Sequence, residues 1–190
     1  QFPGLTQPAV AKVLGLDPSQ VEINTVYAGG SFGRRATQNS DYQVDAALAF
    51  LLLGRKTAVK LMWTREDDIK GGYYRPMAIH KAKVGLDDQG NILGWDHRIV
   101  AKSILKGSPF EGSIKDGIDH ASVEGINNTE YQIPKLSVGL SDAQTKIPVL
   151  WWRSVGHTHT AYTMEVMLDI LAEAAKQDPV EFHCFQINRK

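Results

Sequence analysis

The chain has 190 residues, 43% of them hydrophobic and 22% charged, which is typical of a globular domain large enough to build a core. Its 21 Lys and Arg residues balance 21 Asp and Glu residues, so no general attraction to nucleic acid or to an anionic membrane is expected. The single cysteine, Cys184, excludes a disulfide-dense scaffold, and the longest apolar run, 46–53, is too short for a bilayer span of roughly 20 residues. The compartment, cytoplasmic or periplasmic, stays open.

The first part of the chain predicts a short helix followed by a strand. The helix is expected at 8–14, with Pro8 in its first turn and Gly15 at its end. Apolar and polar residues alternate through 21–27, which predicts a strand whose face from Val21 to Tyr27 packs inward.

A glycine-rich turn, Ala-Gly-Gly-Ser-Phe-Gly-Arg-Arg at 28–35, follows this strand. The segment 42–53 after it is apolar nearly all round, which predicts a helix buried between layers and capped by Gly54. A further strand is predicted at 59–63. Thr64 is then expected to cap a turn of helix, since the charges at 65–68 favour a helix N-terminus.

The second half predicts a hairpin, an irregular connection and two helices. Strands at 79–84 and 92–100 flank a turn signal at 87–91, whereas 105–130 is rich in Gly, Ser, Pro and Asn and predicts a long irregular loop. A strand is expected at 136–140. The helices are a long one at 160–176, with an apolar stripe that belongs to the core, and a short one begun by Asp178 and Pro179.

The glycine-rich turn carries the strongest chemical signal. Glycine has no Cβ, so Gly29, Gly30 and Gly33 can take positive φ and let backbone amides approach a ligand. The following helix would add unpaired amides and a dipole, and Arg34 and Arg35 would add charge for a phosphate. The spacing matches neither the nucleoside-triphosphate loop nor the dinucleotide fingerprint. Taken alone, a phosphate-binding turn and a tight turn beside two solvated arginines remain alternatives.

Three motifs occur in one order: the glycine-rich turn, the segment from Trp63 to Asp68, and Trp-Arg-Ser-Val-Gly-His at 152–157. In this combination the chain resembles the large, molybdenum-cofactor-binding subunit of the xanthine dehydrogenase and aldehyde oxidase superfamily, most closely the isoquinoline 1-oxidoreductase beta subunit branch. The paired arginines and the 152–157 segment favour this branch over the xanthine branch, which usually shows a lysine and an Arg-Gly segment there. The resemblance covers essentially the whole chain and implies an α+β fold with mixed sheets and packed helices.

The resemblance also implies a cofactor, a molybdenum-molybdopterin cytosine dinucleotide, and residues that contact it. The family's Gly-Gly-Gly-Phe-Gly loop touches the pterin and the oxo face of the metal. It corresponds to Gly29, Gly30, Ser31, Phe32 and Gly33 here, with Ser31 in place of the third glycine.

Outside the loop, three residues match family positions. Gln1 matches a glutamine that donates to an apical oxo ligand, although a second Thr-Gln pair, Thr6-Gln7, lies nearby. Arg153 matches an arginine near the metal, where it would orient substrate or stabilise developing negative charge; a buried arginine paired with a carboxylate is the alternative. His157 is expected to form a hydrogen bond near the cofactor.

The family's catalytic base is a glutamate in a C-terminal Gly-Glu segment, and no Gly-Glu pair occurs in this chain. The resemblance therefore implies that residues 1–190 are an inactive fragment of a longer subunit, with a possible subdivision into 1–104 and 131–190. The parent would hydroxylate an N-heterocycle or aldehyde, a small-molecule substrate, with water as the oxygen source. The resemblance also implies that its electrons leave through a separate iron-sulfur small subunit, and the single cysteine here, which cannot ligate a cluster, is consistent with this.

The residues give little support to a metal site or to a hydrolase site. His157 and His159, with His183 and Cys184, offer metal-binding side chains, but the spacing is poor for zinc and no metal ligand is assigned. No Ser, His and acid arrangement shows a nucleophile elbow. The alternative to a cofactor-binding fragment is a non-enzymatic domain whose turn binds a phosphate or a protein carboxylate.

Overall fold

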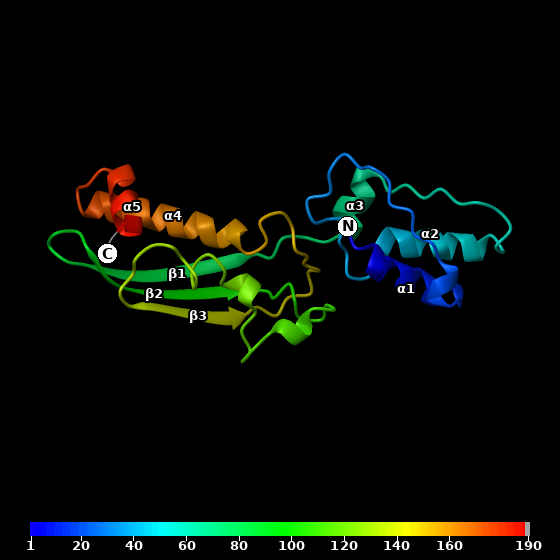
Figure 1. Cartoon of the computed structure of the whole chain (residues 1–190), viewed down its shortest axis with the longest axis horizontal. Helices are drawn as coiled ribbons and strands as arrows, with labels where there is room; N and C mark the ends of the chain where they lie inside the picture. Colours follow the sequence, from blue (N-terminus) through cyan, green and yellow to red (C-terminus); the bar gives the residue numbers. More distant parts are fainter. Residues whose placement is uncertain (189–190) are drawn as a thin grey trace. The chain divides into compact units, whose positions relative to one another are not determined.

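The structure is a computed structural model that describes residues 1–188, and these form two compact units (Figure 1). Unit 1 comprises Gln1–Arg75 and Ile147–Arg153; unit 2 comprises Pro76–Lys146 and the residues from Ser154 onward. The irregular segment 105–130, expected to join two subdivisions, lies within unit 2.

Unit 1 is built on two packed helices, α1 (Pro3–Leu14) and α2 (Asp41–Leu52), with a short 3-10 helix, η1 (Pro18–Gln20), between them. α1 begins before the expected Pro8, which lies inside it, because Pro3 already supplies the fixed φ of a first turn. Gly15, at φ 66°, ends the helix as predicted.

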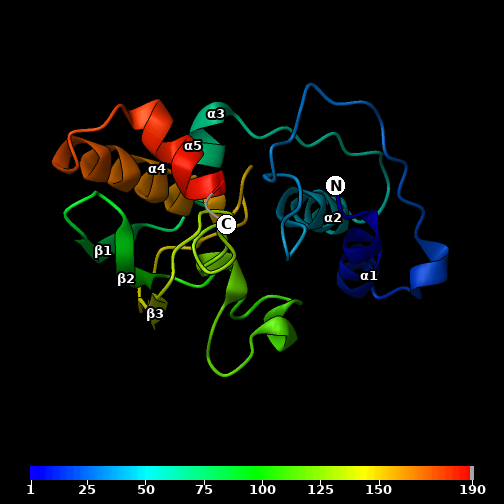
Figure 2. The same ribbon diagram turned by 60° about the vertical axis from the view of Figure 1, so that its left-hand side comes forward.

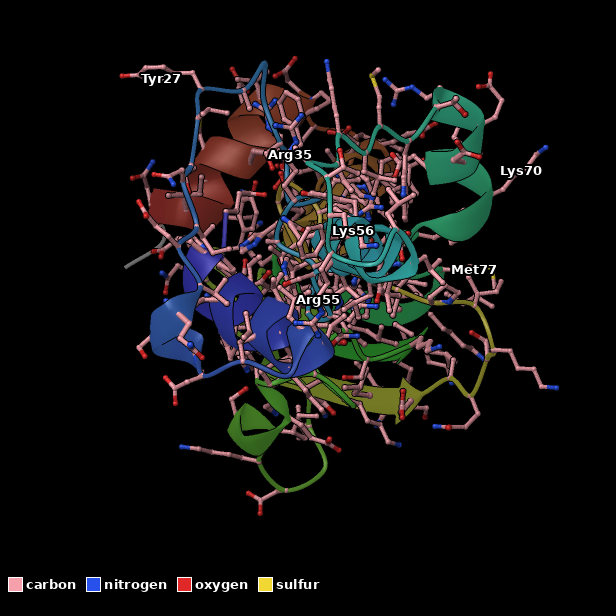
Figure 3. All side chains as sticks on the ribbon, turned by 90° about the vertical axis from the view of Figure 1, so that its right-hand side faces the viewer. Tyr27, Arg35, Arg55, Lys56, Lys70 and Met77 are labelled. Atoms are coloured by element: carbon pink, nitrogen blue, oxygen red, sulfur yellow. The ribbon has the colours of Figure 1, made fainter. Side chains whose placement is uncertain are left out.

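The strand predicted at 21–27 does not form. The segment has no regular secondary structure and pairs with no described strand; Val21 is buried, whereas Tyr27 projects fully into solvent (Figure 3). The strand predicted at 59–63 likewise does not form. Alternation predicts a strand face only where a partner strand and a core are present to receive it, and unit 1 offers neither at these segments.

The prediction that the helix at 42–53 is buried between layers is wrong within unit 1. Only Ala47 of α2 is buried, and several large apolar residues are exposed: Leu48, Leu52 and, at its end, Leu53. The physical reason is that α1 is the one described helix that packs extensively against α2. The predicted stop at Gly54 is confirmed, since this residue takes φ 69° and its amide donates to the Leu51 carbonyl.

The predicted helical turn after Thr64 is confirmed as α3 (Arg65–Gly71). The Thr64 hydroxyl accepts from the Asp67 amide at 3.2 Å, and the Asp67 carboxylate accepts from the Thr64 amide at 2.9 Å. This reciprocal capping box holds the start of the helix, as the sequence indicated.

Unit 2 contains a three-stranded mixed sheet in the order β1-β2-β3. β1 (Ala78–Leu86) and β2 (Ile92–Ala101) form the predicted antiparallel hairpin, and β3 (Leu136–Asp142) pairs parallel to β2. At the hairpin turn the Asp87 carboxylate accepts from the Asn91 amide at 2.8 Å, and Gly90 takes φ 83°.

Two helices cover one face of this sheet, α4 (His157–Ala174) and α5 (Pro179–Asn188) (Figures 1 and 2). α4 begins three residues before the expected Thr160. The predicted apolar stripe packs into the core, with Met164, Leu168 and Leu171 against the buried side chains of β2 and Phe182 of α5. The segment 105–130 is irregular, as predicted, apart from the short 3-10 helices η2 (Glu111–Ser113) and η3 (His120–Ser122).

Candidate functional site

The glycine-rich turn borders a cavity of about 880 Å³ in unit 1, here called the turn cavity. Residues from the N-terminal segment, the turn, α2, the 61–68 segment and Trp152 line it. Among them are Gln1, Gly29, Gly30, Ser31, Phe32, Arg34, Arg35, Tyr42, Trp63, Arg65 and Asp68. The structure therefore gathers most of the site residues predicted from the sequence around one space.

The turn is a compact bend, but it does not lead directly into a helix. Gly30 and Gly33 take φ values of 102° and 99°, and the Arg34 amide donates to the Ser31 carbonyl at 2.9 Å. α2 begins only at Asp41, so the expectation that helix amides and a helix dipole add directly to the turn is wrong. The intervening residues 36–40 separate the two.

The fold requires two of the three glycines of the turn. A Cβ on Gly30 would meet the Phe32 ring at 2.8 Å, and one on Gly33 would overlap the Trp151 carbonyl oxygen, so packing within the unit requires both to lack a side chain. A Cβ on Gly29 would meet nothing within 4 Å, and Gly29 does not take positive φ. Gly29 thus leaves its backbone open to the turn cavity, and the fold itself does not require a glycine at this position.

The segment 151–153 packs against the turn, which brings the predicted Arg153 to this site. The Arg153 amide donates to the Phe32 carbonyl at 2.7 Å, and its guanidinium carbon lies 6.0 Å from the centre of the Phe32 ring. Arg153 is exposed, which disagrees with the alternative of a buried structural arginine. Phe32 is itself 59% exposed and takes φ 54°, an uncommon conformation for a residue with a side chain.

Arg34 is buried and ion-paired. Its Nη2 lies 2.9 Å from Asp41 and its Nε lies 2.7 Å from Asp68, while aromatic rings surround its guanidinium: Tyr42, Trp63 and Tyr73, at 5.6 to 6.0 Å. Burial alone would lower the pKa of Arg34, but the hydrogen bonds and charges of the two carboxylates outweigh it and raise that pKa. Arg34 thus anchors the turn to α2 and α3.

Sequence reasoning did not find this anchoring group. Asp68 belongs to a motif whose charges predict a helix N-terminus, and it does lie in the first turn of α3, but its carboxylate also pairs with Arg34. Asp41 lies seven residues after Arg34, beyond the reach of any local pattern. The available signal was the combination of acidic residues with Trp63 and two tyrosines near a paired arginine.

Three further predicted residues line the cavity: Arg35, Ser31 and Gln1. Arg35 is exposed, so its charge is accessible from solvent. The Ser31 hydroxyl donates to the Gln1 side-chain oxygen at 2.5 Å, which joins the turn to the N-terminal segment. Ser31, the one departure from the family loop, therefore makes a contact that glycine could not make.

His157 lies in unit 2, as the first residue of α4. Its Nδ1 is 3.4 Å from the Glu124 carboxylate, which also accepts from the Gly156 amide at 2.8 Å. A place near a cofactor for His157 stays a prediction. Residues 1–188 contain no group of three His, Cys, Asp or Glu side chains that could hold a metal ion, so the metal interpretation of the histidines, to which the sequence assigns no ligand, gains no support.

The chain was compared with known proteins. The family model described as molybdopterin cofactor-binding domain matches residues 1–184. The chain is 31% identical to the membrane-bound aldehyde dehydrogenase (pyrroloquinoline-quinone) of Gluconacetobacter polyoxogenes, covering 96% of this chain and 24% of that protein. It is 27% identical to the isoquinoline 1-oxidoreductase subunit beta of Brevundimonas diminuta, covering 99% and 24%.

Solved structures agree with the observed fold. Quinoline 2-oxidoreductase from Pseudomonas putida 86 superposes with a TM-score of 0.73 at 20% identity, covering 95% of this chain and 22% of that chain. The chain thus spans about a quarter of the length of the relatives it matches. Within residues 1–188, no helix has the length and apolar character needed to cross a membrane. The match over residues 1–184 shows that the chain belongs to the molybdopterin cofactor-binding domain family of the xanthine dehydrogenase and aldehyde oxidase superfamily.

Proposed function

We propose that this chain forms part of the cofactor-binding surface of a molybdenum-dependent hydroxylase, which oxidises an N-heterocycle or an aldehyde with water as the oxygen source. The relatives support this substrate class, since they include an isoquinoline oxidoreductase and an aldehyde oxidoreductase molybdenum-binding subunit from Escherichia coli. The cofactor would be a molybdopterin cytosine dinucleotide.

The observation that carries the proposal is the free backbone at Gly29. Packing and positive φ account for Gly30 and Gly33, whereas the space that a Cβ on Gly29 would fill is open and borders the turn cavity, so a ligand in the cavity could use it. The same site contains two buried donor atoms, Arg34 Nη1 and Trp152 Nε1, with no acceptor among the described residues. Open backbone and unpaired donors fit a ligand rich in acceptor oxygens.

The charges of the site assign different roles to the two arginines. Arg34 already binds two carboxylates, so its positive charge is compensated. Arg35 and Arg65 also line the turn cavity and are exposed, so the phosphate groups of the cofactor would meet these two. Arg34 would instead hold the turn in shape.

When bound, the cofactor supplies a metal centre that accepts two electrons from the substrate. This chain would contribute the surroundings of that centre. The Gln1 amide would donate a hydrogen bond to it, and the exposed Phe32 ring would shield it from water. Arg153, adjacent to Phe32, would orient the substrate or stabilise developing negative charge. The base that removes a proton would come from outside residues 1–190, and an iron-sulfur small subunit would take the electrons onward.

The test is a cofactor analysis of the intact protein that contains this chain, purified together with its partner subunits. Metal analysis should find molybdenum, and acid hydrolysis should release cytidine monophosphate. Molybdenum with a different nucleotide would correct the form of the cofactor but keep its class. Pyrroloquinoline quinone without molybdenum, or neither cofactor, would overturn the proposal and favour a non-enzymatic binding domain.

A further inference from the structure

Four side chains of unit 2 form a continuous row of hydrogen bonds, here called the histidine row. The Trp95 indole nitrogen lies 3.0 Å from His97 Nδ1, and His97 Nε2 lies 2.9 Å from His80 Nδ1. His80 Nε2 then lies 2.9 Å from His159 Nδ1. Trp95 and His97 are on β2, His80 is on β1 and His159 is in the first turn of α4, so the row joins the helix to both strands.

The indole at one end fixes the direction of every hydrogen bond in the row. An indole N–H can only donate, so His97 Nδ1 must accept and the proton of His97 resides on Nε2. His97 Nε2–H then donates to His80 Nδ1, which places the proton of His80 on Nε2. His80 Nε2–H in turn donates to His159 Nδ1, which places the proton of His159 on Nε2. All three imidazoles are therefore neutral Nε2–H tautomers while the row is intact.

Protonation breaks the row because it adds a hydrogen to Nδ1, which already faces a donor in each ring. Burial opposes that proton: His97 is fully buried, and burial together with the nearby His80 lowers its pKa from 6.5 to about 4. Burial and His80 likewise lower the pKa of His159 to about 4. The pKa of His80 is lowered by its burial.

The other charged groups on these elements do not cancel the lowering of the histidine pKa values by burial. Asp96 of β2 acts in the opposite direction on His97 but is paired with Arg98 at 2.8 Å. Lys81 of β1 alternates to the exposed face of its strand, away from His80. On α4, His157 faces Glu124, and Glu165 faces Tyr131 and His183.

The row cannot transfer a proton from one end to the other, because the Trp95 indole does not release its proton near neutral pH. It can hold two elements together but cannot pass a proton through. We propose that the histidine row is an acid-sensitive latch, which fastens the first turn of α4 to β1 and β2 at neutral pH and releases it on acidification.

The direction of the effect follows from the protonation states. Above about pH 6.5 the three rings are neutral in both the folded and unfolded chain, so the latch contributes its full stability. As the pH falls toward about 4, the unfolded chain binds protons that the intact row excludes, and stability is lost. The first turn of α4 also carries His157, so release would change the surroundings of that residue.

The first measurement determines the tautomers by ¹⁵N NMR of the imidazoles in the intact protein. At about pH 7.5, His97, His80 and His159 should all show Nε2–H and pyridine-like Nδ1 signals. An Nδ1–H tautomer or an imidazolium signal in His97 at that pH would overturn the proposal, and this result needs no variant.

The second measurement follows amide hydrogen exchange, corrected for the intrinsic rate, between about pH 7.5 and about pH 4.5. Protection of amides in 160–163 should fall roughly tenfold more than protection in 168–172 of the same helix. His80→Gln keeps one acceptor and one donor but cannot become charged, so it should reduce this pH dependence by the share of His80 and leave the share of His97 and His159. His80→Leu should lose the protection at both pH values, and His120→Gln, at an exposed histidine, should behave as wild type. If the protection of both segments changes with pH by the same factor in wild type, the latch is refuted.

Discussion

Paired alanine substitutions at Gly33 and Gly29 separate what the glycine-rich turn does for the fold from what it does for a ligand. At Gly33, φ is 99°, and a Cβ would overlap the Trp151 carbonyl and lie 2.9 Å from the Trp152 Cα. At Gly29 the added methyl group meets no atom within 4 Å. The same chemical change therefore has two different expected outcomes.

The magnitudes follow from these two environments. A side chain in a left-handed conformation costs roughly 1–2 kcal/mol, and overpacking against backbone that cannot move aside adds about 1–3 kcal/mol. Gly33→Ala should thus reduce the free energy of unfolding of unit 1 by about 2–5 kcal/mol. Gly29→Ala should change it by no more than about 0.5 kcal/mol, because the site is open.

The assay combines urea unfolding, monitored by tryptophan fluorescence, with the molybdenum content of each purified intact protein. Gly33→Ala should lose stability and cofactor together. Gly29→Ala should keep its stability yet lose a large fraction of its cofactor, because the methyl group occupies the space that the ligand would use. Wild-type stability in Gly33→Ala would refute the packing argument. Wild-type cofactor content in Gly29→Ala would refute the assignment of the open space to a ligand.

Three further predictions test other parts of the molecule. Asp68→Asn removes one of the two carboxylates bound to the buried Arg34 and should cost about 1–3 kcal/mol in urea unfolding; a loss no larger than that of the exposed Asp88→Asn would contradict the anchoring role. Phe32→Ala should lower turnover of the complete enzyme while its Tm stays nearly unchanged, since the ring is 59% exposed, and equal turnover would count against shielding. Leu168→Ala, at a fully buried position, should cost about 2–5 kcal/mol by circular dichroism, and a loss below about 1 kcal/mol would show that this core is misassigned.

Local chemistry made several elements predictable from the sequence. The hairpin at 87–91, the cap at Thr64 and the stop at Gly54 each depend on residues within a few positions of one another, and each is confirmed. The α4 stripe was predictable for the same reason, because a helix repeats its buried face over one continuous segment.

Features that depend on distant partners were not predictable in this way. The alternation at 21–27 was interpreted as a strand, but a strand needs a neighbour that no local pattern specifies. Arg34 was expected to bind phosphate, yet Asp41 and Asp68 occupy its guanidinium once the chain folds. The histidine row joins residues from β1, β2 and α4, and only the strand register and the packing of α4 bring them together.

The glycine-rich turn shows, in one segment, both what the sequence could predict and what it could not. The sequence identified the motif and the residues of the candidate site, and the family match agrees with that identification. It did not separate Gly30 and Gly33, which the fold requires, from Gly29, which it does not. That distinction depends on Phe32 and on the 151–152 segment, and the latter is more than a hundred residues away.

The most direct test of the central claim is an anomalous difference map, recorded at the molybdenum absorption edge from crystals of the intact protein with its cofactor. The account predicts a molybdenum peak beside the turn cavity, with pterin density against the backbone of Gly29 and the phosphate groups near Arg35. A molybdenum peak remote from the glycine-rich turn, or cofactor density that leaves the Gly29 backbone in contact with solvent, would contradict it.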